Sequence, residues 1–142
     1  METGPSGVEV LDEQECLALL ATGHVGRVGI VVDSQPLIFP VNYVFDEGSI
    51  IVHTGVGTLL SGASLAHVAF EIDSFDVGRR SGWSVLVQGV GHDITSSLDR
   101  TSERLQSLEV APWAPGDKPR LLRIDATTVS GRRFGEQPDP PA

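Results

Sequence analysis

Hydrophobic and β-branched residues dominate two neighbouring runs in the first half of the chain. The runs Pro36–Phe45 and Ser49–Thr54 flank the tripeptide Asp46-Glu47-Gly48. Glycine adopts positive φ without strain, and the flanking residues favour a pleated surface, so the pattern predicts a β-hairpin. Gly55-Val56-Gly57-Thr58 follows directly. Its backbone N–H groups and its hydroxyl are suited to holding an anion.

The rest of the pattern is also mainly that of strands. Glycines inside the expected strands, such as Gly26 and Gly89, indicate bends where a sheet curls on itself. Pro40 lies within a strand, which indicates an edge, a bulge or a ligand-facing position. No alternation of strand and helix is visible, so we expect a small closed or split antiparallel β-barrel. The further expected strands are His24–Val32, His67–Asp73, Gly82–Thr95, Leu121–Asp125 and Thr128–Phe134.

Helices are expected at three places. Asp12 as N-cap and Glu15 in the capping-box position open the first, which ends at Thr22-Gly23. A short helix is expected within Leu59–Ala66, and another from Ser96 or Ser97 to Leu108. The segment Ser74–Ser81 is polar and turn-like. We therefore expect one domain over residues 11–134, preceded by a flexible leader (1–10) and followed by a disordered tail (135–142).

Composition narrows the function. The chain has 142 residues, which is enough for one domain with a core, and its net charge is −9. This charge argues against nucleic acid as a partner, because phosphate contacts need clustered cations. Lys118 is the single lysine, so a bound phosphate must be held by arginine, hydroxyls or backbone amides. No apolar run is long enough to span a membrane, and the first ten residues lack signal-peptide features. The lone Cys16 also suits the cytoplasm.

Most catalytic motifs are absent. The four histidines show no metal-ligand spacing with cysteines or acids, so we expect no metal site. Cys16 lies on the apolar face of the first helix, where a buried and unreactive thiol is expected. There is no nucleophile elbow and no Walker loop, and Gly55-Val56-Gly57 alone is a weak signal.

Three segments, in this order and spacing, carry a resemblance that covers about residues 11–134. They are Pro40-Val41-Asn42-Tyr43, the run from His53 to Thr58, and the run from Gly82 to Val87 (GWSVLV). Together they resemble the pyridoxamine 5′-phosphate oxidase-like, FMN-binding split-barrel family, in the branch that includes the nitroimidazole-resistance proteins.

The resemblance implies a six-stranded antiparallel split barrel, mainly β with short helices. It implies a homodimer with FMN in each of two clefts between the subunits. His53 matches a candidate catalytic position, although a structural role for a lone histidine stays open. Trp83 can instead be an aromatic residue of the core or of the subunit interface. Asn42 can instead satisfy a local backbone group. The cofactor-binding residues implied are Pro40, Val41, Asn42, Tyr43, His53, Thr54, Gly55, Gly57, Thr58 and Trp83.

One position departs from the family pattern. Leu59 stands where FMN-binding relatives typically carry a lysine that meets the phosphate. A hydrogen bond to a charged group contributes about 1.5–3 kcal/mol, so its loss weakens FMN by about ten- to a hundredfold. Arg27, Arg79 or Arg80 can compensate. A deazaflavin or haem in place of FMN, or no cofactor, also stays open.

The sequence thus predicts a flavin-dependent oxidoreductase acting on a small molecule. The alternative is a non-catalytic protein that binds or senses a flavin, deazaflavin or haem on the same fold. A true pyridoxamine-phosphate oxidase is disfavoured, because the basic residues for the substrate phosphate are not evident.

Overall fold

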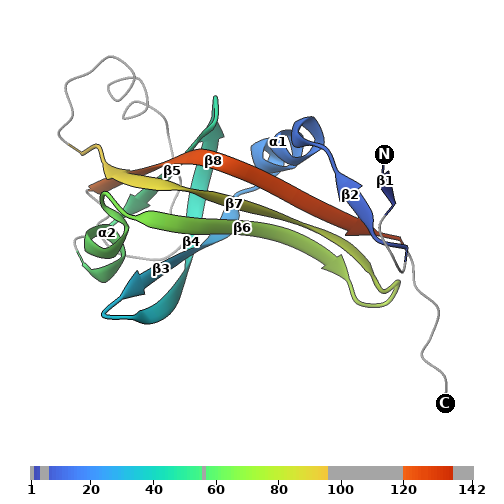
Figure 1. Cartoon of the computed structure of the whole chain (residues 1–142), viewed down its shortest axis with the longest axis horizontal. Coiled ribbons are helices and arrows are strands. Elements are labelled where there is room, and N and C mark those ends of the chain that lie inside the picture. Colours follow the sequence, from blue (N-terminus) through green and yellow to red (C-terminus); the bar gives the residue numbers. More distant parts are fainter. Residues whose placement is uncertain (1, 4–6, 56, 96–119, 136–142) are drawn as a thin grey trace.

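The structure is a computed structural model that describes residues 2–3, 7–55, 57–95 and 120–135. Eight strands and two helices lie in these ranges (Figure 1). In chain order they are β1 (Glu2–Thr3), β2 (Glu9–Leu11), α1 (Glu13–Thr22), β3 (Val25–Val32), β4 (Gln35–Asp46), β5 (Ser49–Thr54), α2 (Thr58–Ala63), β6 (His67–Asp76), β7 (Ser81–Asp93) and β8 (Arg120–Phe134).

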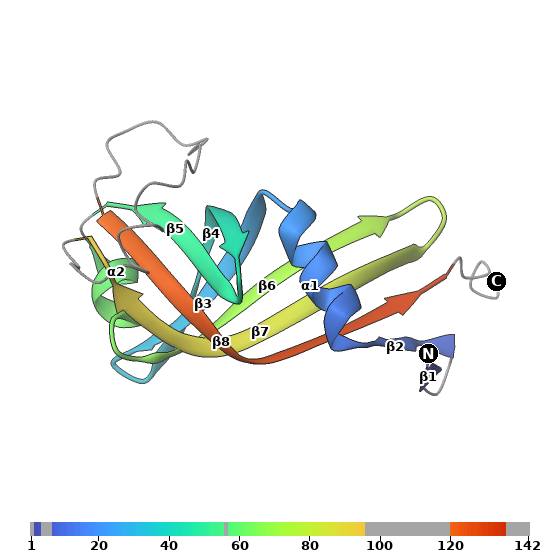
Figure 2. The ribbon, with the colours of Figure 1, turned by 90° about the horizontal axis from the view of Figure 1, so that it is seen from above.

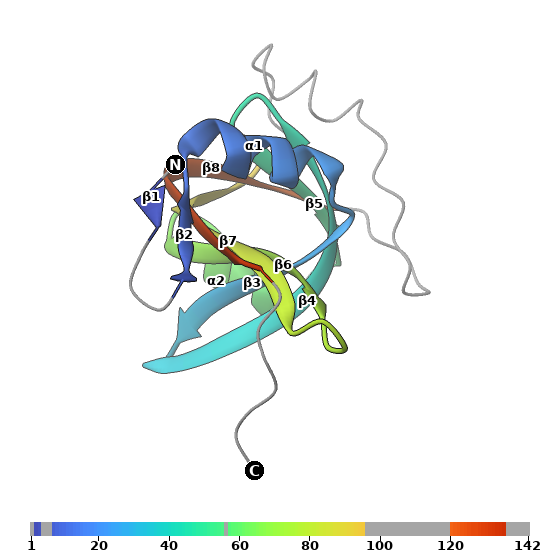
Figure 3. The same ribbon diagram turned by 90° about the vertical axis from the view of Figure 1, so that its right-hand side faces the viewer.

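Six of the strands close into an antiparallel barrel. The sheet order is β8-β5-β4-β3-β6-β7, and β7 pairs again with β8, which completes the ring (Figure 3). The expected six-stranded split-barrel fold is therefore confirmed. β6, β7 and the end of β8 continue beyond the ring as a long ribbon, and α1 lies beside this end of the barrel (Figure 2).

The predicted hairpin forms between β4 and β5. Asp46 pairs with Ser49, and the two residues between them, Glu47 and Gly48, have φ of 45° and 87°. Positive φ at both central positions is the turn geometry that matches the twist of the strands. The turn residues thus behave as the sequence predicts.

Alternation along the strands builds the core. Val28 and Ile30 of β3, Phe70 of β6, and Val85 and Val87 of β7 are all buried inside the barrel. Gly26 is required here, because a Cβ at this position would collide with the Phe70 ring. The interior is a packed hydrophobic core, so a ligand must bind outside it.

Helix α1 ends as the sequence predicts. The Glu15 N–H donates to Asp12 Oδ1 at 2.8 Å, and Gly23 is the C-terminal cap. Cys16 and Leu20 of this helix are fully buried, and burial raises the pKa of the Cys16 thiol. The expectation of a buried thiol is confirmed.

Three sequence predictions are wrong at their boundaries, and two others lie outside the described residues. Residues 9–10 are not a loose leader, because β2 pairs with β8. The segment Ser74–Ser81 is not all turn, since β6 continues to Asp76. The last two expected strands are one strand, β8, with an irregularity opposite Gln88 and Gly89 that absorbs an extra residue. The helix expected from Ser96 or Ser97 and the tail after residue 135 lie outside the described residues.

Within the described ranges, neither helix is long and apolar enough to cross a membrane. Nor does any group of three or more metal-ligating side chains occur in the same ranges.

Candidate functional site

One surface of the barrel collects polar side chains that the core does not use. Strand alternation points every second residue of β3, β6 and β7 outward between more buried neighbours, and their partners on β4 and β8 point the same way. We call this surface the outer face. Two rows cross it, as the strand register shows. The first is Pro40–Arg27–Glu71–Leu86–Ser130, which is paired throughout. The second consists of two paired parts, Asn42–Val25 and Asp73–Ser84–Arg132, because the pairing of β3 with β6 ends at Arg27 and Glu71.

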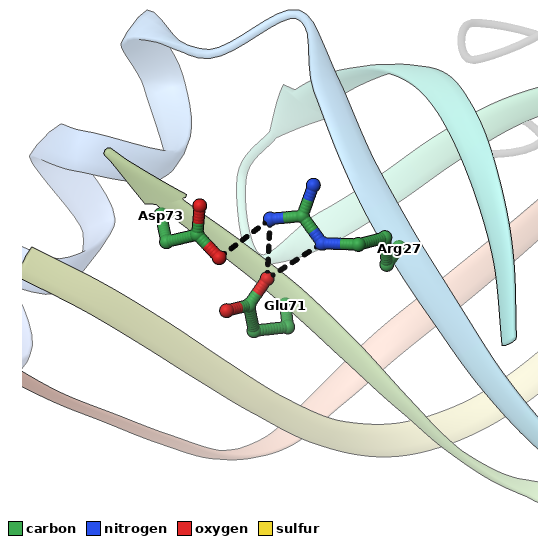
Figure 4. A network of polar contacts seen from close by, with 3 residues as sticks. All are labelled: Arg27, Glu71 and Asp73. Atoms are coloured by element: carbon green, nitrogen blue, oxygen red, sulfur yellow. Dashed lines mark hydrogen bonds and ion pairs between the residues drawn. The ribbon is translucent and has the colours of Figure 1, made fainter. Parts of the chain in front are cut away.

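The outer face carries a three-residue ionic cluster (Figure 4). Arg27 Nε lies 2.9 Å from Glu71 Oε1, and Arg27 Nη2 lies 2.8 Å from Asp73 Oδ2. Two carboxylates thus share one guanidinium. Partial burial and then the hydrogen bond with Asp73 raise the pKa of Glu71, against the lowering effect of Arg27. Because both carboxylates contact its guanidinium, the positive charge of Arg27 is already neutralised in the structure.

The raised pKa of Glu71 predicts a stability effect. A carboxyl whose pKa is higher in the folded state binds protons more tightly there, so the free energy of unfolding falls as the pH rises above its unfolded pKa. Glu71→Gln removes this fall in the free energy of unfolding, because glutamine does not titrate, and it leaves Arg27 paired with Asp73 alone. We expect the variant to gain about 1 kcal/mol or less relative to wild type between mildly acidic and neutral pH, the range of partly exposed pairs.

Urea denaturation at several pH values measures this difference. Glu13→Gln, an exposed change on α1, is the control. A difference between Glu71→Gln and wild type that is the same at every pH would contradict the assignment.

Two of the predicted site residues lie on the outer face, and a third, His53 on β5, points to the same side. Pro40 is exposed and sits directly opposite Arg27, in the half of β4 that pairs only with β3. Asn42 Nδ2 donates to the His24 carbonyl at 3.4 Å, the local backbone role that the sequence left open. His53 pairs with Leu121 and lies one residue beyond the Tyr43–Val52 pair, so it points to the same side as Asn42.

Tyr43 and Val41 point the other way. Tyr43 is 2% exposed, its hydroxyl donates to the Leu20 carbonyl at 2.6 Å, and its ring meets Phe70 edge-on. Burial raises the pKa of Tyr43 to about 12. Val41 packs against the same core. Alternation turns both side chains toward the core, so the backbone groups of this segment remain the predicted cofactor contacts.

The loop before α2 is exposed at Gly57 and Thr58, whereas Thr54 and Gly55 are half-buried. The Thr54 hydroxyl donates to the Gly55 carbonyl at 3.3 Å. Leu59, which follows this loop, is only 8% exposed and belongs to the core. The departure from the family pattern therefore fills a core position in this chain.

Trp83 is separated from these residues. It lies on the inner face of the ribbon and lines a hollow of about 370 Å³ with Arg79 and Arg133. Along β7, eight residues or about 26 Å separate Trp83 from Gly91, which packs against α2 at Ala63. Within one chain, Trp83 and the Gly55–Thr58 loop thus lie at opposite ends and do not form one site.

An apolar patch adjoins the ionic cluster on the outer face. Val31 and Ile38 are 64% and 72% exposed. They border a hollow of about 540 Å³ whose floor includes Gly29 and Ala69. We call Val31, Ile38 and this hollow the apolar patch. Exposed neighbouring apolar side chains of this kind make the patch a candidate interaction surface.

Sequence reasoning missed Glu71 and Asp73. The signal was present, since the run His67–Asp73 (HVAFEID) alternates and places both acids on the face opposite its buried residues. What was missing was the pairing of β3 with β6, which brings Arg27 to them.

Comparison with known proteins places this geometry in a family. A family model described as pyridoxamine 5′-phosphate oxidase matches residues 12–133. The chain belongs to this family. The uncharacterized protein Rv0080 of Mycobacterium tuberculosis is 32% identical over 130 residues, covering 87% of this chain and 84% of the relative.

Solved structures of family members share the fold. A FAD-binding protein from Mycobacterium smegmatis is 31% identical, with a TM-score of 0.67 over 89% of this chain and 98% of its own. A FAD-binding protein from Mesorhizobium loti is 25% identical, with a TM-score of 0.72 over 90% and 99%. A candidate 5-nitroimidazole antibiotic resistance protein from Bacteroides thetaiotaomicron, at 14% identity and a TM-score of 0.67 over 95% and 93%, shares the fold. The expected family is thus confirmed.

Proposed function

We propose that this protein binds a flavin on its outer face, beside Pro40, Asn42 and Arg27. The observation that carries the proposal is the 31% identity, over nearly the whole chain, to a protein described as FAD-binding. The outer face suits such a ligand, since it combines an amide, a guanidinium and the exposed half of β4. Groups of this kind satisfy the polar edge of a ring system, while apolar neighbours cover its faces.

We propose FAD or FMN as the cofactor. Two relatives described as FAD-binding favour FAD, and Leu59 leaves no cation at the position that FMN-binding relatives use. Bound flavin supplies the transfer of electrons or hydride to a small substrate, which makes the protein an oxidoreductase. The residues of the chain then hold and orient it, and His53 beside Asn42 is the candidate reactive side chain. The exposed Gly57 and Thr58 stay candidates for a phosphate contact.

We also propose that the protein works as a homodimer in the cytoplasm. The apolar patch exposes two large aliphatic side chains side by side and adjoins the proposed cofactor face. A second copy placed on it buries Val31 and Ile38 and encloses the flavin between the two subunits. Because Trp83 lies at the other end of the chain, it can meet a cofactor near the Gly55–Thr58 loop only from the second copy, and a place in the core or the interface is equally open to it.

An absorbance spectrum of the purified protein tests the flavin proposal, repeated after incubation with FMN or FAD and desalting. We expect retained absorbance in the flavin region. Removing the amide in Asn42→Ala is expected to weaken binding about tenfold, the effect of one hydrogen bond of about 1.4 kcal/mol. Gln35→Ala, an exposed polar change on the same strand, is the control. A protein that retains neither flavin would refute the proposal.

A second candidate function is non-catalytic binding or sensing of a flavin, a deazaflavin or haem. The neutralised Arg27 and the buried Leu59 favour the haem-binding form of this candidate, since neither position offers a free cation to a flavin phosphate. Anaerobic addition of NADH, NADPH or a reduced deazaflavin separates the candidates. Bleaching of the flavin band supports the oxidoreductase, whereas an unchanged band supports the binding protein. A Soret band after incubation with haem would identify the haem-binding variant of this function.

A further inference from the structure

A second hollow of the outer face lies at its far edge, where β7 and β8 meet the chain around β2. Its volume is about 450 Å³, and Ser84, Ser130 and Arg132 line it on the polar side. Val8, Val10 and Leu86 form an apolar wall. Ser84 pairs with Arg132, and Leu86 with Ser130, so these side chains share one side of the sheet.

Arg132 is available in this hollow. Within the described residues its guanidinium has no ion-pair or hydrogen-bond partner, and no acid lines the hollow. The neighbouring Arg133 points to the other side of β8, where it pairs with Glu9 at 3.4 Å. A cation with two nearby hydroxyls and no competing carboxylate is suited to an anion.

The other arginines considered for a phosphate are less suitable. Arg27 is held by Glu71 and Asp73. Arg79 and Arg80 lie in the turn of the β6–β7 ribbon, and Arg79 lines a hollow that also contains Asp76. Of these arginines, Arg132 combines an unpaired guanidinium with a hollow that no acid lines.

The spacing across the sheet connects this hollow to the proposed flavin face. Pro40 and Ser130 lie in the same row, four strand spacings or about 19 Å apart along the curved sheet. Asn42 and Arg132 each follow two residues further along the same strands. This span is comparable to the length of an extended flavin mononucleotide. Glu71 and Asp73 lie between the two ends, where carboxylates accept hydrogen bonds from the hydroxyls of a ribityl chain.

We propose that Arg132, together with the hydroxyls of Ser84 and Ser130, binds the phosphoryl group of the flavin. The inference rests on the proposed function and assigns to β7 and β8 the phosphate contact that Leu59 does not make. The flavin then lies across the strands, with its ring near Asn42 and its phosphate in the hollow beside Val10.

Comparing riboflavin with FMN isolates the phosphate contact. Dissociation constants of both are measured by fluorescence quenching for wild type, Arg132→Gln and the control Arg80→Gln. We expect Arg132→Gln to weaken FMN about tenfold or more, with riboflavin binding within about twofold of wild type. Ser84→Ala and Ser130→Ala are expected to act in the same direction with smaller effects. The strand position of Arg132 is exposed, and a melting curve confirms that the variant folds.

The outcomes separate the two proposals. An FMN-to-riboflavin affinity ratio that stays the same in Arg132→Gln as in wild type and Arg80→Gln overturns this inference and leaves flavin binding intact. The same holds if only Arg27→Gln lowers the ratio, because the phosphate then lies at the ionic cluster. A wild-type protein that binds neither riboflavin nor FMN overturns the inference and the proposed function together.

Discussion

Ile38→Asp is expected to convert the proposed homodimer into a monomer. Ile38 is 72% exposed in the single chain and borders the apolar patch. Covering an isoleucine contributes about 1.5–3 kcal/mol, and a buried unpaired carboxylate costs several kcal/mol more. Each 1.4 kcal/mol changes an equilibrium constant tenfold, so we expect the dimer to weaken by about a thousandfold or more.

Sedimentation of wild type and variant over a range of concentrations measures this effect. Val77→Asp is the matched control, because Val77 is 88% exposed in the turn of the β6–β7 ribbon, away from the patch. If the cofactor lies between the subunits, Ile38→Asp also loses flavin. A variant that stays dimeric, or a wild type that is monomeric at high concentration, would refute the proposed interface.

Leu59→Lys is expected to destabilise the fold without restoring a phosphate contact. Leu59 is 8% exposed and packs in the core beside Leu60. Forcing a longer side chain into a packed core costs about 1–3 kcal/mol. A lysine here must also carry its charge out to water rather than bury it, so we expect a loss near the upper end, about 3 kcal/mol.

Urea denaturation measures this loss, and FMN titration measures the affinity. Thr58→Lys is the matched control, since the neighbouring Thr58 is exposed and takes a cation on the loop surface. If the Gly55–Thr58 loop holds the phosphate, Thr58→Lys tightens FMN binding. A stable Leu59→Lys variant with tighter FMN binding would show that position 59 reaches the cofactor after all.

The local signals in the sequence were accurate because they depend on neighbours along the chain. The Asp12 cap, the stop at Gly23 and the turn at Glu47-Gly48 each involve residues within four positions of one another. The same is true of strand alternation, which predicts that Phe70 and Ile72 face one side and Glu71 and Asp73 the other. The strand boundaries were less accurate, because the length of β6 depends on its pairing with β7.

The predictions for the candidate site show the same difference between local and long-range information. From the sequence, the run Pro40–Tyr43 reads as one binding segment. In the structure its residues alternate between the outer face and the core, where Tyr43 meets Leu20 and Phe70. Trp83 and the Gly55–Thr58 loop both match the family pattern, yet the length of β7 separates them.

The sequence by itself determined the family, the mainly β architecture and the helix and turn ends, because these follow from local pattern. Only the tertiary structure decided which side chains share a surface. The pairing of β3 with β6 brings Arg27 to Glu71, 44 positions away, and the closure of β7 on β8 brings Ser84 to Arg132, 48 positions away. Such contacts depend on register across strands, which residue type alone does not encode.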